Sequence, residues 1–457
     1  MKILFVTPEC TPLAKAGGLG DVSAALPAAL RELGVDVDIL LPAYAEVLGK
    51  VGKAQERARF SELGFECALL DAQSILLLRA PQLYERDGSP YQDPGGQDWP
   101  DNALRFGLLS RVAARLAPEY DVVHCNDWPA ALAPVFAGDR KTLLTIHNLA
   151  FQGNFERSWL RRLDLGEERF SVEELEFHGR LSFLKGGLVR AAAINTVSPT
   201  YAREIQTEEL GCGLDGLLRQ RTAVLSGVLN GIDTALWNPA GDPHLAQRYD
   251  ASSLEKKGVN KEALQRRLNL EVDPHIPLLG FIGRLTQQKG ADLIAAAATE
   301  LAALPAQLAL LGRGEREFEG ALAAAAARHP GRVAVAMGFN EELAHLIEGG
   351  ADVFLMPSRY EPCGLNQMYS QRYGTPPVAC ATGGLLDTVA DGETGFLFER
   401  AESAALTAAV RRALAAWREP RRWREIQRAG MGRDFSWRAA ARQYADLYSR
   451  IASGARP

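Results

Sequence analysis

Short apolar runs alternate with helical stretches along the whole chain, and this alternation constrains the fold more than any other feature. In the first half we expect strands at 3–7, 37–41, 122–125, 143–146, 193–197 and 224–229, and helices that include 22–33 and 181–190. In the second half we expect strands at 278–282, 307–311, 333–337, 353–356 and 378–381, and helices at 291–301, 315–328 and 341–348. Continuous apolar strands between helices are typical of parallel sheets covered on both faces. The sequence therefore predicts an α/β fold.

The alternation occurs in two series, which indicates two doubly wound, Rossmann-like domains. A chain of 457 residues is too long for one ordinary hydrophobic core. The stretch 238–243 carries two prolines and a glycine, so we place the boundary there, with domains at 1–240 and 241–436. Because open α/β sheets bind ligands at the carboxyl ends of their strands, we expect two such edges to face one cleft.

Composition excludes several classes of partner. The net charge of −5 is small for this length and indicates neither a nucleic-acid nor an anionic-membrane partner. The six cysteines are scattered without a C-x-x-C pair, which predicts a reduced protein with no zinc site. The first apolar run stops at Pro8, too early for a signal peptide or a membrane span. We therefore expect a cytoplasmic protein.

The most informative stretch is SRYEPCGLNQ at 358–367, followed by ATGGL at 381–385. It places Glu361 just after an expected strand and a glycine pair where a helix can begin. A constrained carboxylate suits neutral sugar hydroxyls, and a glycine-rich helix start suits phosphate. The alternative is a surface glutamate in an ordinary loop.

Two other stretches place cations after strands. KAGGLGD at 15–21 offers Lys15 and glycine amides to an anion, although a tight turn with a solvated lysine fits this pattern equally well. It matches neither G-x-G-x-x-G nor the P-loop pattern. Arg284 and Lys289, five residues apart, can both point at one diphosphate. The alternative for this pair is a charged turn neutralised by surface acids.

His147 and Asp127 also follow expected strands. A lone histidine is more often part of a core than a catalyst, and no H-E-x-x-H or His/Cys cluster accompanies His147. We therefore expect no metal site. The cations would then have to neutralise a departing diphosphate themselves.

Taken together, these motifs resemble those of bacterial glycogen synthases and plant starch synthases, the ADP-glucose-using α-1,4-glucan synthases. The resemblance runs almost end to end, through blocks at 15–21, 41–44, 145–149, 230–233 with 237–239, 260–261 with 264–265, 284–286 with 288–290, and 357–389. It implies the GT-B architecture, with a C-terminal segment at 437–457 that returns to the first domain as a helix. It also implies a hexosyltransferase that moves glucose, with retention and without a metal or other cofactor, from ADP-glucose to the non-reducing 4-OH of glycogen or another α-1,4-glucan.

The resemblance also implies roles for single residues. Lys15, Arg284 and Lys289 resemble the diphosphate ligands, and Glu361 the acid that holds the glucose hydroxyls. His147, Asn148 and Asp127 resemble the groups around the glucosyl centre, and Phe339 an aromatic residue against the adenine. The remaining substrate-binding positions implied in this way are Gly17, Gly18, Asp21, Cys363, Gly364, Thr382, Gly383 and Gly384.

The sequence departs from the commonest family pattern at Ala16, Asn126 and Tyr360, none of which is a proposed charged ligand. Three alternatives stay open at this stage. One is a transferase that uses UDP-glucose or a small acceptor. The others are a non-catalytic glucan- or sugar-nucleotide-binding protein and a phosphorylase of similar fold, although no pyridoxal-binding lysine motif is recognisable.

Overall fold

The computed structural model describes residues 1–454 and divides into two compact units. The first comprises Met1–Gly231 together with residues 437–454, and the second comprises Ile232–Ser436. The 238–243 stretch, where the sequence analysis places the boundary, lies inside the second unit. There Trp237 stacks on His345 and Tyr369, with ring centroids 4.0 Å apart in each pair. These contacts attach the connecting segment to the second unit.

A nine-stranded sheet forms the centre of the first unit, in the order β12-β11-β7-β6-β1-β2-β5-β4-β3. Its strands are β1 (Lys2–Val6), β2 (Asp36–Pro42), β3 (Gln55–Glu62), β4 (Phe65–Asp71), β5 (Ile75–Arg79), β6 (Val122–Asn126), β7 (Thr142–Ile146), β11 (Ala193–Thr196) and β12 (Leu225–Gly227). A smaller sheet holds β8 (Asn154–Phe155), β10 (Arg180–Ser182) and β9 (Glu176–Phe177) in that order, all antiparallel. The helices of this unit are α1 (Gly18–Glu32), α2 (Ala45–Lys50), α3 (Pro81–Tyr84), α4 (Asn102–Leu116), α5 (Asp127–Ala130), α6 (Ala133–Ala137), α7 (Trp159–Arg162), α8 (Phe183–Arg190), α9 (Pro199–Glu204), α10 (Asp215–Gln220) and α19 (Trp437–Ser453).

A six-stranded sheet forms the centre of the second unit, and all its neighbouring strands are parallel, in the order β15-β14-β13-β16-β17-β18. Its strands are β13 (Leu278–Leu285), β14 (Gln307–Gly314), β15 (Val333–Met337), β16 (Val353–Met356), β17 (Pro377–Cys380) and β18 (Phe396–Phe398). Its helices are α11 (Lys257–Arg267), α12 (Ala291–Ala303), α13 (Arg316–Arg328), α14 (Glu341–Gly350), α15 (Asn366–Arg372), α16 (Gly383–Thr388), α17 (Ser403–Trp417) and α18 (Pro420–Met431).

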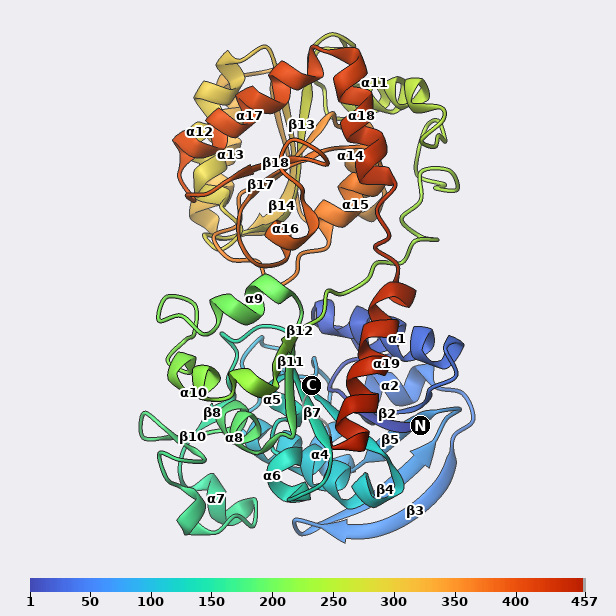
Figure 1. Ribbon diagram of the computed structural model, residues 1–457, viewed down its shortest axis with the longest axis vertical. Coiled ribbons are helices and arrows are strands. Elements are labelled where there is room, and N and C mark those ends of the chain that lie inside the picture. Colours follow the sequence, from blue (N-terminus) through green and yellow to red (C-terminus); the bar gives the residue numbers. More distant parts are fainter. Residues whose placement is uncertain (455–457) are drawn as a thin grey trace. The chain divides into compact units, whose positions relative to one another are not determined.

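The expectation of an α/β fold is confirmed, but the first sheet is not wholly parallel. The strands β3 and β4 form an antiparallel hairpin that extends the sheet beyond β5 (Figure 1). At its turn Leu63 and Gly64 both have positive φ, 49° and 80°, as in the two-residue turns that suit the twist of a hairpin. The expected helix 181–190 begins only at Phe183, because the preceding residues pair with β8 and β9.

The C-terminal helix α19 packs on α1 and β6 of the first unit (Figure 1). Its apolar face includes Tyr444 and Tyr448, both buried. Nδ1 of His124 on β6 lies 2.7 Å from the hydroxyl of Tyr448, and Asn195 on β11 donates to the hydroxyl of Tyr444 at 2.9 Å. These two polar contacts as well as apolar packing therefore hold α19 to the first sheet.

Candidate active site

The candidate residues of the first unit follow β1, β6 and β7, which are neighbours in the sheet. These strands run parallel, so their carboxyl ends lie at one edge. Lys15 is in the loop after β1, Asp127 directly follows β6, and His147 directly follows β7. The fold thus brings Lys15 to the same sheet edge as Asp127 and His147, which lie more than a hundred residues later in the chain.

The loop before α1 has room for a ligand at its glycines. Gly17 is the N-cap of α1, and its φ of −150° is one that any residue adopts. A Cβ added at Gly17 or Gly18 would lie more than 4 Å from the heavy atoms of the described residues, apart from its own chain neighbours. Packing within the chain therefore does not require glycine at these positions. Nζ of Lys15 lies 2.8 Å from both carboxylate oxygens of Asp21, and this pair is well exposed.

Asp127 has an unusual backbone conformation, with φ of 54°. Its Oδ1 accepts a hydrogen bond of 2.7 Å from the backbone N–H of His147, which links the ends of β6 and β7. Burial raises the pKa of the Asp127 carboxyl to about 7, although the backbone hydrogen bonds from His147 and Asn148 oppose the shift. The group therefore changes its protonation near neutral pH.

The ring of His147 is held by Asn126. The Nδ2 of Asn126 donates to the carbonyl of Val6 at 3.0 Å, so its Oδ1 is the atom that lies 3.0 Å from Nε2 of His147. This arrangement assigns the proton to Nε2 and leaves Nδ1 as an acceptor. Burial lowers the pKa of His147 to about 4, so the ring is neutral at physiological pH. Oδ1 of Asn148 accepts a hydrogen bond of 3.0 Å from the backbone N–H of Ala150.

In the second unit, Lys289 and Glu361 form an ion pair. Nζ of Lys289 lies 2.5 Å from Oε2 of Glu361, which also accepts from the hydroxyl of Ser358 at 3.0 Å. Only 6% of Glu361 is exposed. The alternative that Glu361 is a surface loop residue is therefore wrong.

The loops after β13 and β16 are packed tightly against each other, which explains why Lys289 and Glu361 form an ion pair. Gly290 has φ of 71°, and a Cβ there would come within 2.2 Å of the carbonyl oxygen of Pro357. Arg359 donates to both carboxylate oxygens of Asp292, at 2.7 and 2.6 Å. Arg284 lies near the carboxyl end of β13 and is exposed, with a long contact of 3.4 Å to Oε1 of Gln288.

The backbone conformation and close packing near Glu361 require glycine at several positions. Gly364 has φ of 72°, and Gly383 has φ of 44°. The N–H of Gly384 donates to the carbonyl of Glu361 at 3.0 Å, and a Cβ at Gly384 would lie 2.0 Å from the carbonyl oxygen of Cys363. Thr382 is the N-cap of α16 and is buried. These residues join the ends of β16 and β17 closely.

Phe339 lies in the loop between β15 and α14, and 88% of its surface is exposed. This is the highest exposure among the large apolar residues that the structure describes. Gly338 before it has φ of 111°, which re-aims the chain as it leaves the strand. The ring is therefore available to a ligand.

Sequence reasoning missed two polar residues at these edges. Glu9 is 3% exposed and accepts from the N–H groups of Ala16 and Gly17, at 2.6 and 2.8 Å. Ser358 supports Glu361, as described above. The position of each residue in the sequence could have indicated it, because each lies within three residues of the end of a buried strand.

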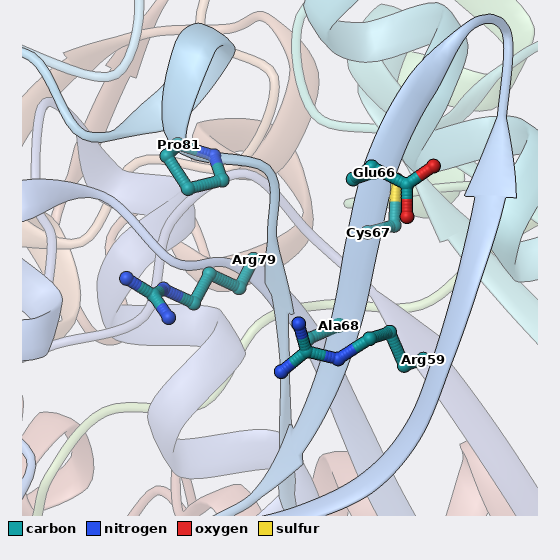
Figure 2. Close-up of a pocket in the computed structure, with 6 residues that line it drawn as sticks. All are labelled: Arg59, Glu66, Cys67, Ala68, Arg79 and Pro81. Atoms are coloured by element: carbon teal, nitrogen blue, oxygen red, sulfur yellow. The ribbon is translucent and has the colours of Figure 1, made fainter.

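A separate hollow lies beside β4 and β5 and is lined by Arg59, Glu66, Cys67, Ala68, Arg79 and Pro81 (Figure 2). Both of its arginines have acidic partners, since Arg59 pairs with Glu56 and Arg79 pairs with Glu85 at 2.7 Å each. We therefore do not assign it to an anionic substrate. Within residues 1–454, no group of three or more His, Cys, Asp or Glu side chains is arranged to hold a metal ion.

Comparison with known proteins identifies the family. The model of the starch synthase catalytic domain matches residues 2–220, and that of the group 1 glycosyl transferases matches residues 262–429. The glycogen synthase of Aromatoleum aromaticum is 52% identical over 100% of this chain and 98% of its own length. The chain belongs to the glycogen synthase and starch synthase family. Glycogen synthase 1 of Methylococcus capsulatus is 49% identical, over 99% of this chain and 97% of its own.

A solved member of the glycogen synthase and starch synthase family has the same fold. The catalytic domain of starch synthase IV from Arabidopsis thaliana, bound to ADP and acarbose, is 31% identical with a TM-score of 0.83, over 99% of each chain. The expected GT-B fold is thus confirmed, and so is the prediction of a hexosyltransferase with glycogen synthase activity. Among the described residues, no helix has the length and apolar character needed to cross a membrane.

Proposed function

We propose that this glycogen synthase uses ADP-glucose as its donor and extends the non-reducing 4-OH of an α-1,4-glucan, with retention and release of ADP. The observation that carries the proposal is that Lys289 pairs with Glu361 at one edge of the second sheet. Arg284 lies near the carboxyl end of β13, the strand that Lys289 follows. The ADP and acarbose held by the related starch synthase support this choice of donor and acceptor. Relatives about half identical over their full length are glycogen synthases, which supports glycogen as the natural acceptor.

Charge stabilisation is the main task of the site in this proposal. Glycosyl transfer passes through an oxocarbenium-like state while negative charge develops on the leaving diphosphate. Arg284 can bind a phosphate with two parallel hydrogen bonds, and Lys289 adds a point charge. Lys15 and the free amides at the start of α1 contribute in the same way. These groups supply the positive charge from the chain itself, so we propose that no metal or other cofactor is needed.

The glucose and the adenine have separate ligands in this proposal. The buried Glu361 carboxylate accepts hydrogen bonds from glucose hydroxyls, and the neutral His147 ring offers Nδ1 as a second acceptor. Asp127 positions the His147 backbone, which its Oδ1 already binds. The exposed ring of Phe339 stacks on the adenine. Asn148, Asp21, Cys363, Gly364 and Thr382 shape the surroundings of these contacts.

One assay tests the donor, the acceptor and the reaction. The protein is incubated with ADP-glucose or UDP-glucose labelled in the glucose, with either glycogen or maltose as acceptor, and label in the product is counted. We expect label from ADP-glucose to be incorporated into glycogen. An enzyme that cleaves α-1,4 links should release this label from the polymer, and a chelator should leave the rate of incorporation unchanged. Faster transfer from UDP-glucose would reject the donor, and transfer only to maltose would reject the polymer acceptor. No incorporation from either donor would favour a binding protein.

A further inference from the structure

Glu9 is a buried carboxylate that links the loop before α1 to a second segment of the first unit. Its Oε2 accepts from the N–H groups of Ala16 and Gly17, at 2.6 and 2.8 Å. Its Oε1 accepts from the hydroxyl of Tyr91 at 2.7 Å. Only 3% of the residue is exposed. Three donors thus satisfy one carboxylate in a site almost closed to water.

These contacts decide which amides of the loop are free for a ligand. An anion that displaced Glu9 from Ala16 and Gly17 would leave its carboxylate buried with one partner, which is costly. The amides of Ala16 and Gly17 are therefore committed to the protein. The amides of α1 that can face an anion begin at Gly18, where the helix starts.

Tyr91, the third partner of Glu9, lies near the residue that follows Asp127. The ring of Tyr91 lies 6.2 Å from the ring of Trp128, which directly follows Asp127 in the chain. Asn102 donates to the carbonyl of Tyr91 at 2.9 Å and holds this segment to α4. Glu9 thus connects the Lys15 loop with the residues that surround Asp127.

We infer that Glu9 is a positioning residue for the donor diphosphate. By holding the amides of Ala16 and Gly17, its carboxylate orients the start of α1 and the Lys15 loop toward the ligand. This inference rests on the proposed function, in which the loop binds the diphosphate of ADP-glucose. Glu9 itself contacts no phosphate in this arrangement, since its oxygens already have their donors.

Two conservative variants separate geometry from charge. In Glu9→Gln, the carbonyl oxygen can still accept from both amides, and the new NH₂ can donate to the Tyr91 hydroxyl. In Glu9→Asp, the charge stays but the carboxylate is withdrawn by one methylene. We expect the KM for ADP-glucose to stay within about threefold of wild type in Glu9→Gln and to rise by about tenfold in Glu9→Asp, as expected for the loss of a charge-assisted hydrogen bond. In both variants kcat changes less than KM.

A charge readout distinguishes this role from simple structural support. The Glu9 carboxylate acts electrostatically on three titratable groups with shifted pKa values, Tyr44, Tyr91 and Asp127. Burial holds the pKa of both tyrosines well above its ordinary value, so Asp127 is the one of the three that titrates near neutral pH. The Glu9 charge raises the pKa of Asp127. Glu9→Gln should therefore move the corresponding midpoint of the pH–rate profile to lower pH, while Glu9→Asp should not.

Hydrogen exchange tests the loop without any reaction. In the full-length protein without nucleotide, the segment containing Ala16 and Gly17 should exchange slowly in wild type and Glu9→Gln, and faster in Glu9→Asp. Glu174→Ala is the matched control, because Glu174 is a buried carboxylate of the same unit paired with Arg169 and Arg190. We expect it to leave the KM and the exchange of this segment unchanged.

The outcomes separate this inference from the proposed function. If the wild-type protein transfers no glucose from ADP-glucose, the proposed function fails, while the exchange experiment still tests the contact of Glu9 with the loop. A wild-type KM and wild-type exchange in Glu9→Asp would overturn the inference. So would a KM in Glu9→Gln as high as in Glu9→Asp, because the geometry kept in Glu9→Gln would then not be enough to position the loop.

Discussion

Nζ of Lys289 lies 2.5 Å from Oε2 of Glu361, and this contact joins the loops that follow β13 and β16. The cation that we propose for the diphosphate and the acid that we propose for glucose are therefore one ion pair. Removing either partner leaves the other charge in a largely buried place. Effects of substitution at these two positions must consequently be separated into stability and catalysis.

Lys289→Ala should lower both stability and rate. We expect a loss of unfolding free energy of about 1–3 kcal/mol, because Glu361 keeps only Ser358 of the two side-chain partners described above. We expect kcat to fall by about 10²–10³, as for the loss of one preorganised charge donor. The double variant Lys289→Met with Glu361→Gln should recover stability but not rate. Thermal unfolding and steady-state kinetics measure the two effects. Near wild-type turnover in Lys289→Ala would contradict the role.

Arg284→Ala should affect the rate alone. Arg284 is exposed and has a long contact with Gln288, so its loss should change the unfolding free energy by no more than about 0.5 kcal/mol. We expect kcat to fall by about 10²–10³ with ADP-glucose and glycogen. Arg411→Ala is the control, an exposed arginine on α17 paired with Glu300. If both variants keep wild-type rates, Arg284 does not bind the diphosphate.

Parts of this arrangement could be predicted from the sequence, and the limit has a physical reason. Buried strands are recognised by their apolar runs, so Lys289 and Glu361 could each be placed after a strand. Their pairing across 72 residues depends on β13 and β16 being neighbours, which periodicity does not encode. The strand β3 was missed because it is mostly exposed and lacks a continuous apolar run, whereas β4 does carry one. Glu9 was missed because its position after a buried strand does not show that the loop folds back and places the amides of Ala16 and Gly17 on its carboxylate.

Asp127→Asn should stabilise the protein more at pH 8 than at pH 5. The pKa of Asp127 is raised from its ordinary value to about 7, so the native state binds this proton more tightly than the unfolded chain. The stability that this provides is present below about pH 4 and is lost as the pH rises through about 7. Asparagine tolerates the φ of 54° and can still accept from the His147 N–H.

The measurement for Asp127→Asn is the difference in Tm from wild type across this pH range. Asp139→Asn serves as the control, because Asp139 is an exposed acid of the same unit. Its difference in Tm should not depend on pH. A difference for Asp127→Asn that is constant or that shrinks with rising pH would show that the carboxyl is not destabilised by burial.

Phe339→Ala should weaken donor binding without affecting the fold. The ring is 88% exposed, so its removal should cost no more than about 0.5 kcal/mol of stability. Loss of stacking, worth about 0.5–1.5 kcal/mol beyond area burial, should raise the KM for ADP-glucose by about three- to tenfold. Phe339→Tyr should restore the KM, and Val172→Ala, at a residue 70% exposed in the first unit, should leave it unchanged. An unchanged KM in Phe339→Ala would remove the ring from the adenine site.

Tyr448→Phe should destabilise the first unit through its C-terminal helix. The hydroxyl of Tyr448 lies 2.7 Å from Nδ1 of His124, whose Nε2 lies 2.7 Å from Oγ1 of Thr145. Burial holds the pKa of His124 well below its ordinary value, so the neutral ring depends on these two partners. Removing one leaves a buried ring nitrogen unpaired, at a cost of about 1–3 kcal/mol. Calorimetry of the full chain should therefore give a lower Tm for Tyr448→Phe, whereas Arg442→Ala, on the exposed face of the same helix, should match wild type. Equal Tm values for Tyr448→Phe and wild type would mean that the contact between Tyr448 and His124 does not help to anchor α19.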